Sequence, residues 1–563
     1  MDQLPQELIE RIVGNVGYNE RKAILTLNKR FHDAAERTFS PFDSMSVGEN
    51  DLDDFVDIFS RYRRLHLLRV FKFLPKLPTL GRDETGEYIC RESQALLNQR
   101  DEDYSRQIHA LFRAIGAAEE RVGEPASFKL ILPSPTREIK ETEGCIHPSN
   151  VSWRVHLLRA DSLCKVESVT ELKLDEQHIR YYDYMAHPTV FSLDLRVILD
   201  LASRLPNLVK LTSSVKDSYD NSSHEYGGKH FYRRWEGPRR DSRHGFIQAF
   251  HEDGVSFPRS LSILHLDFDN DIEEMDQRHP LPNLLHPAVP HDLFSSSLRI
   301  LTQHLRQLKL CVAADCTLFW PAEKSTTSPF WPHLESLFIN LHPAHPSGSW
   351  YFNGPNHAGK VSSGYTITPL QYPPLITTTD ECERWDSDGF RRDTVSSCNF
   401  RFVPDLPVLE PFLCAFAKAS DFMPCLKEAV LWTEIRFTAN ESPDDDFDGP
   451  GEDVWFPRRE DSSDWPNRDW QTMLGWGFAY LAPNFSPTTG RCGSPPTQSG
   501  SRQFWWMMGP YHPSLAAQND LRGIGAVQYG EGLREHVSCK WEDLEVFQKW
   551  CLDELQSERS AYW

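Results

Sequence analysis

The sequence predicts an α/β protein with a small helical domain at its N-terminus. Three short amphipathic helices are expected in the first 40 residues, and helical periodicity alternates with short apolar strands from about residue 104. The strands share one spacing of apolar residues, so we expect parallel strands inside and helices outside. The predicted boundaries are 1–45 for the helical domain, 46–440 for the repeated units, 441–469 for an acidic linker or insertion and 470–563 for a tryptophan-rich cap.

The N-terminal domain is predicted from helix start signals and apolar spacing. Pro5 stands at a first-turn position where its missing N–H costs no intrahelical hydrogen bond. Leu8, Ile9 and Ile12 follow at spacings that share one face. We expect the three helices at Pro5–Val13, Glu20–Leu27 and Lys29–Arg37.

Six later segments share an L-x-x-L-x-L pattern, which is typical of the strand half of leucine-rich repeats. They are VTELKL (169–174), LVKLTS (208–213), LSILHL (261–266), LRQLKL (305–310), LESLFI (334–339) and LKEAVL (426–431). Their first positions are 39, 53, 44, 29 and 92 residues apart. The pattern therefore predicts an irregular leucine-rich-repeat solenoid with insertions at 214–256, 268–291 and 340–400. An ordinary α/β domain with leucine-rich strands is the alternative.

Helices and a cap complete the expected architecture. Helical periodicity precedes several strands, at Tyr104–Ala118 before FKLIL (128–132), at Asp194–Leu205 and at Asp292–His304. Nine of the sixteen tryptophans lie from Trp455 onward, and a helix is expected at Trp541–Leu555. We expect this segment to cap the open end of the solenoid, because such a large aromatic surface is normally buried away from water.

Composition restricts the class of partner. The formal net charge of −21 disfavours nucleic acid and anionic membrane as partners. No run approaches the ~18 apolar residues that cross a bilayer, and Asp2 and Glu7 stand where a secretory signal carries basic residues. The twelve cysteines form no CxxC pair. We expect a cytoplasmic or nuclear protein with reduced thiols that binds other proteins, without nucleic acid or membrane.

The sequence offers only weak motifs for metal binding or catalysis. Two calcium-like stretches, DFDNDI at 267 and DDDFDG at 444, lack the glutamate that completes a calcium loop, because Arg278 and Trp455 occupy its place. Phosphate-binding glycine loops, the G-x-S-x-G turn and HExxH are absent from the sequence. We expect neither a cofactor nor a metal, and no enzyme activity.

The N-terminal pattern resembles the F-box. LPQELIERIV supplies the Leu-Pro start and the following Glu-Leu, and ILTLNKRFHD supplies the second-helix apolar residues and the polar and aromatic residues of the third helix. An F-box followed by leucine-rich repeats is a recurrent arrangement, notably in divergent F-box-like families of filamentous fungi. The resemblance implies that the head docks on the Skp-type adaptor of a cullin-RING ubiquitin ligase, and that the repeats bind the protein to be ubiquitylated.

This resemblance assigns residues to adaptor binding. Leu4, Pro5, Leu8, Ile9 and Ile12 are expected to contact the adaptor, with Ile24, Leu25 and Phe31 shared between the contact and the domain core. The alternative is an internal helical bundle packed on residues 52–73. The alternative function is a scaffold or ligand-sensing repeat protein that does not recruit the ligase, since Arg21 and Lys22 replace the usual apolar pair of the second helix.

Two further groups are candidates for substrate binding. Strand alternation predicts that six side chains point away from the core: Lys173, Thr212, His265, Lys309, Phe338 and Val430. The stretch KHFYRRWEGPRRDSR (229–243) could bind an acidic or phosphorylated peptide through Arg233, Arg234, Trp235, Arg239 and Arg240. Simple solvent exposure is the alternative for both groups, and the basic stretch could also bind the acidic 440s segment of its own chain.

Overall fold

The computed structural model divides the chain into two compact units, residues 1–213 with 257–261, and residues 214–256 with 262–563. It describes residues 4–17, 20–38, 42–61, 64–80, 92–138, 153–175, 189–215, 236–268, 277, 280–322, 328–373, 375, 399–438, 471–485, 500–538 and 542–543. The predicted linker 441–469, Arg233, Arg234, Trp235 and most of the helix expected at Trp541–Leu555 lie outside these residues.

The first unit begins with a three-helix head, residues 4–38. Its helices are α1 (Gln6–Gly14), α2 (Arg21–Ile24) and α3 (Lys29–Thr38), close to the predicted bounds. The Asn28 side chain accepts a hydrogen bond from the backbone N–H of Phe31 at 3.1 Å, which satisfies an N–H at the start of α3. The head has its own apolar core, formed by Ile9, Val13, Ile24, Phe31, Ala34 and Ala35.

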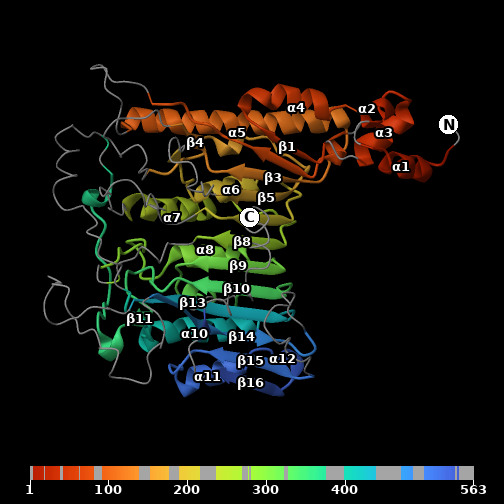
Figure 1. Ribbon diagram of the computed structural model, residues 1–563. Coiled ribbons are helices and arrows are strands. Elements are labelled where there is room, and N and C mark those ends of the chain that lie inside the picture. Colours follow the sequence, from red (N-terminus) through yellow and green to blue (C-terminus); the bar gives the residue numbers. More distant parts are fainter. Residues whose placement is uncertain are drawn as a thin grey trace. The chain divides into compact units, whose positions relative to one another are not determined.

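A parallel sheet follows in the first unit, with the order β1 (Ser44–Val47), β2 (Val70–Phe73), β3 (Phe128–Pro133), β5 (Val169–Asp175) and β7 (Lys210–Ser213). Its helices are α4 (Leu52–Phe59), α5 (Gln94–Val122) and α6 (Arg196–Ala202), with 3-10 turns η2 (Glu49–Asp51), η3 (Arg64–Leu67) and η5 (Ala160–Ser162) (Figure 1). The short strands β4 (Thr136–Arg137) and β6 (Thr189–Val190) pair separately. The ring of Phe71 in β2 stacks on the ring of Phe55 in α4, with their centres 4.4 Å apart. This contact identifies the face of the sheet that the helices cover.

The second unit contains a mixed sheet. Strands β8 (Ile263–Asp267), β9 (Gln307–Val312), β10 (Ser336–Leu341) and β13 (Glu428–Thr438) run parallel, and β14 (Gln471–Leu481) is antiparallel to β13 and to β15 (Arg502–Met507). Strand β16 (Leu533–Ser538) is parallel to β15, and β17 (Glu542–Asp543) pairs with β14. The helix expected at Trp541–Leu555 is therefore wrong at Glu542–Asp543, because this backbone pairs with β14.

Helices and turns of the second unit connect these strands. The helices are α7 (Glu236–His251), α8 (Leu293–Leu301), α10 (Leu406–Ser420), α11 (Leu515–Arg522) and α12 (Ala526–Tyr529). Shorter elements are η7 (Cys316–Leu318), η8 (Pro355–His357), η9 (Pro369–Gln371) and the pair β11 (Phe352–Asn353) and β12 (Val403–Pro404). Phe416 of α10 lies 5.6 Å from Phe478 of β14, so α10 packs on the sheet.

The leucine pattern explains the core of both units. In all six L-x-x-L-x-L segments, positions one, four and six are buried, including Ser213, the polar exception. Positions four and six belong to strands whose side chains alternate in direction, so they share the helix face of their sheet. The α/β class with parallel strands and helices is confirmed, and residues 471–538 add β14, β15 and β16 to the second sheet.

Candidate functional site

The head exposes apolar side chains to solvent. Leu8 and Ile12, one turn apart on α1, are 45% and 44% exposed. Leu25 and Leu27, just after α2, are 38% and 57% exposed, and Pro5 is also exposed. Four of the twelve large apolar side chains that are exposed among the described residues thus fall between Leu8 and Leu27. We call Pro5, Leu8, Ile12, Leu25 and Leu27 the head patch; such a concentration is typical of a protein-binding surface.

The structure divides the residues that the sequence assigned to adaptor contact. Ile9, Ile24 and Phe31 are only 0%, 6% and 3% exposed and belong to the core of the head. They pack beneath the exposed side chains and do not themselves form the surface. Leu4 is half-buried against the same core. Leu27 was missed by the sequence reasoning. Its alternation with Leu25 across Thr26 is a pattern that could have indicated it.

An ion pair joins the head to residues 52–73. Glu36 of α3 accepts hydrogen bonds from Nη2 and Nε of Arg64 at 2.6 and 3.0 Å, and the Arg64 guanidinium lies 4.5 Å from the Phe42 ring centre. The alternative in which residues 52–73 cover the apolar face of the head does not fit the described structure, because Leu8, Ile12 and Leu25 remain exposed.

The second candidate group lies on the sheet faces opposite the helices. Lys173 pairs in register with Thr212 in the first unit, and both are half-buried. In the second unit the row runs from His265 through Lys309 and Phe338 to Val430. The predicted positions therefore do align across each sheet.

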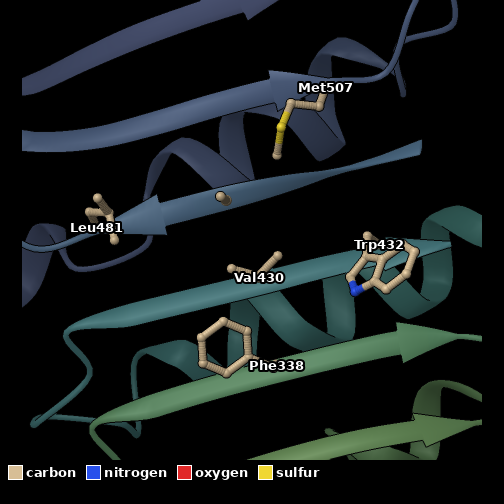
Figure 2. Close-up of a cluster of buried hydrophobic side chains, with 6 residues drawn as sticks. Phe338, Val430, Trp432, Leu481 and Met507 are labelled. Carbon is tan, nitrogen blue, oxygen red and sulfur yellow. The ribbon is translucent and has the colours of Figure 1, made fainter. Parts of the chain in front are cut away.

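Three members of that row are not exposed, which corrects the prediction. His265, Phe338 and Val430 are only 5%, 6% and 1% exposed. Phe338 and Val430 form a buried cluster with Trp432, Ala479, Leu481 and Met507. Figure 2 labels five of these six residues, all except Ala479. Phe338 and Val430 are buried because β14 and β15 continue the sheet beside β13 and contribute apolar side chains to this cluster. Lys309, with its ammonium 5.3 Å from the Phe338 ring centre, is half-buried.

The described part of the basic stretch binds its own unit. Arg239, 6% exposed, donates to Glu236 at 3.2 Å, and Arg240 donates to Asp241 and to the Tyr372 hydroxyl at 3.1 and 2.7 Å. The substrate-binding assignment of Arg239 is therefore wrong, since the side chain is buried in α7, and Arg240 is half-buried among internal partners.

A buried polar network joins α7, α8 and η7. Asp292 accepts from Arg243 at 2.7 Å and caps the start of α8 through the Phe294 and Ser295 N–H groups. Burial, followed by the nearby Asp292 carboxylate, raises the pKa of Asp315 to about 6. These groups bond to one another within the second unit, so they indicate a structural role. Among the described residues, no group of three or more His, Cys, Asp or Glu side chains could hold a metal ion.

Comparisons with known proteins give no assignment. No protein family model matches the chain, and no curated protein matches it significantly. None of the helices in the described ranges combines the length and the apolar character that crossing a bilayer requires.

Proposed function

We propose that the protein is a substrate receptor of a cullin-RING ubiquitin ligase. In this proposal the head is an F-box-like domain whose patch binds the Skp-type adaptor, and the sheets belong to an irregular leucine-rich-repeat solenoid that binds a protein substrate. The protein acts in the cytoplasm or nucleus and performs no catalysis itself. The head patch is the observation that carries the proposal, because four of the twelve exposed large apolar side chains among the described residues lie in this one small domain, which already has a core of its own.

Capture of the adaptor and cullin by the full chain tests this function. The double variant Leu8→Asp, Ile12→Asp places two charges in the patch and should reduce capture about tenfold or more, because each charge would be desolvated in the interface. Val527→Asp is the matched control, since Val527 is 78% exposed and lies on α12. Its capture should equal that of the unsubstituted chain. Absence of capture by the unsubstituted chain, where a standard F-box protein captures both components, would refute the proposal.

The alternative function is a protein-interaction scaffold or ligand-sensing repeat protein that does not recruit the ligase. It is favoured by the sequence of the second helix, where Arg21 and Lys22 stand in place of the apolar pair that is usual in the F-box. The same capture experiment separates the two functions. A chain that binds other proteins but neither adaptor nor cullin would be a scaffold.

A further inference from the structure

The buried cluster of the second unit lies on the sheet face opposite the helices. Phe416 of α10 packs on Phe478 of β14, which identifies the helix face. Strand alternation turns Ala479, the next residue of β14, to the opposite face. Figure 2 shows the labelled side chains of the cluster in front of the sheet, with helices behind it. We call the six residues the covered cluster: Phe338, Val430, Trp432, Ala479, Leu481 and Met507.

The covered cluster is too deeply buried for an open sheet face. Val430 is 1% exposed, and none of the six residues exceeds 6%. Neighbours in the same sheet cover the flanks of a side chain, but only a second layer, about 10 Å from the sheet, covers it from above. The described apolar side chains that pack against the cluster are those of Phe485, just after β14, and Trp505, within the same sheet. We infer that the second layer includes residues outside the described ranges.

The C-terminal segment, residues 544–563, begins beside the covered cluster. The chain passes from β16, which pairs with β15, to β17, where Glu542 pairs with Gly475 of β14. Gly475 is two residues along β14 from Gly477, which pairs with Met507 of the cluster. Two residues of a strand span about 6.6 Å, so the segment begins one side-chain repeat from the cluster.

The sequence of this segment is amphipathic. Its apolar residues recur at the i, i+3, i+7 and i+11 positions that share one helix face: Leu544, Phe547, Cys551 and Leu555. Charged residues four apart occupy the opposite helix face: Glu545, Lys549 and Asp553. Twelve helical residues are about 18 Å long, and the outer two of four neighbouring strands are about 14 Å apart, so such a helix can cross the cluster. The helix expected at 541–555 therefore stays a prediction from residue 544 onward.

Two other stretches next to these strands fit an apolar face less well. Residues 439–470, between β13 and β14, contain eleven Asp and Glu residues, whose carboxylates would lose water against the cluster. Residues 486–499, between β14 and β15, contain no large apolar residue. The C-terminal segment combines four Asp and Glu residues with a continuous apolar stripe, so its sequence suits the cluster best.

We propose that residues 544–563 bind the covered cluster through an amphipathic helix on the sheet face opposite α10. The proposal does not depend on the proposed function, because both partners belong to one chain. Trp432, Trp505 and Lys309 already interact with further groups of the chain, which agrees with an intramolecular cover. A protein substrate would reach this part of the sheet only by displacing the segment.

Photo-cross-linking in the full chain tests the proposal. The probe is benzoylphenylalanine in place of Phe547, and irradiation should join it to peptides that contain Val430, Trp432 or Met507 of the same chain, identified by mass spectrometry. The same probe in place of Lys549, on the opposite helix face, is the matched control and should give about a tenth as much of these products or less. Equal yields from the two positions would overturn the proposal. Products of twice the chain mass would assign the cover to a second copy, which would also overturn it.

Oxidation of methionine by hydrogen peroxide measures the cover directly. Phe547→Asp with Cys551→Asp places two charges against the cluster, so the segment should leave and Met507 should oxidise about tenfold faster or more. Met508, the next residue and 0% exposed, is the internal control, and its rate should change by less than about twofold. An unchanged rate at Met507, or an equal rise at both methionines, would overturn the proposal.

Two further variants complete the oxidation experiment. Lys549→Asp with Gln556→Asp adds charges to the polar helix face and should leave the Met507 rate unchanged, so an equal increase here would contradict the predicted orientation. Trp455→Asp with Trp465→Asp tests residues 439–470 as the competing occupant. If this variant alone exposed Met507, the cover would be that stretch and the proposal would be wrong.

Discussion

At the scale of single residues, Arg243 forms a buried ion pair in the second unit. The Arg243 and Asp292 side chains are 1% and 2% exposed, and Nη2 lies 2.7 Å from Oδ2. The guanidinium also lies 4.2 Å from the Phe294 ring centre. Removing one partner leaves the other charge buried without its counterion, which costs about 3–5 kcal/mol.

Arg243→Met should therefore destabilise the start of α8 strongly. Hydrogen exchange of residues 293–301 checks this, because local opening should become easier by about 3 kcal/mol or more. Arg121→Met is the matched control. Arg121 lies 3.3 Å from Asp57 with both side chains more than half exposed, so its loss should change stability by under about 1 kcal/mol. Equal effects of the two substitutions would contradict the assignment of a buried, structural ion pair.

His345 predicts a pH dependence of stability. Its Nδ1 accepts a hydrogen bond from the Ser347 N–H at 3.0 Å, which requires an unprotonated Nδ1. Burial lowers the pKa of His345 from 6.5 to about 4, against the opposing charge of Asp292. As the pH falls from 6.5 towards 4, His345 takes up a proton in the unfolded chain but stays neutral in the folded chain. The stability contributed by the neutral histidine is thus present above 6.5 and is lost in that window.

His345→Asn should reduce this loss, since an asparagine oxygen can accept the same N–H without titrating. The melting temperature of both proteins between pH 7 and 4 provides the measurement. Asp315 acts in the opposite direction, because its raised pKa of about 6 means that stability falls as the pH rises from 3.8 to 6. The difference between variant and unsubstituted chain cancels this contribution. Parallel curves for the two proteins would contradict the role of His345.

At the scale of elements, the sequence predicted the helices and strands that local apolar spacing determines. The three head helices, α5, α8 and the leucine-bearing strands follow from apolar spacing, and Asp292 at the N-cap of α8 stands at the predicted start. The burial of Phe338 and Val430 could not be predicted in this way. It depends on β14, whose residues pair with β13 from 33 to 53 positions away in the sequence, and on β15, which pairs with β14. Long-range strand pairing leaves no periodic signal in either partner.

Gly477 shows how closely β13 and β14 approach. It pairs in register with Trp432, and a Cβ added to it would lie 2.6 Å from the Trp432 Cα and closer still to the Leu431 carbonyl oxygen. Gly477→Ala should therefore separate these strands, at a cost of about 1–3 kcal/mol or more. Thermal unfolding followed by tryptophan fluorescence is the measurement. Gly500→Ala, where the added Cβ meets no atom within 4 Å, should leave the melting temperature unchanged, and an equal shift in both would refute this packing argument.

At the scale of the whole molecule, the candidate surfaces differ in how far the sequence revealed them. Leu8, Ile12 and Leu25 of the head patch were named from the motif, because exposed apolar residues in a short helical domain are visible locally. The row from His265 to Val430 was also named, from strand alternation. Its burial was not predicted, because the side chains that bury Phe338 and Val430 come from strands that follow later in the sequence.

The head should act independently of the sheet of the first unit. The core of the head consists of its own residues, and the buried leucines of the strands form a different core. Substitutions that share no contacts have additive effects. Leu8→Asp with Ile12→Asp, two exposed positions, should therefore reduce adaptor capture about tenfold or more and leave the melting temperature of the chain unchanged. Capture and thermal unfolding on the same preparations test this. A head variant that lowered the melting temperature of the whole chain as well as capture would show that the two parts are coupled, and a receptor built from separate modules would then be the wrong description.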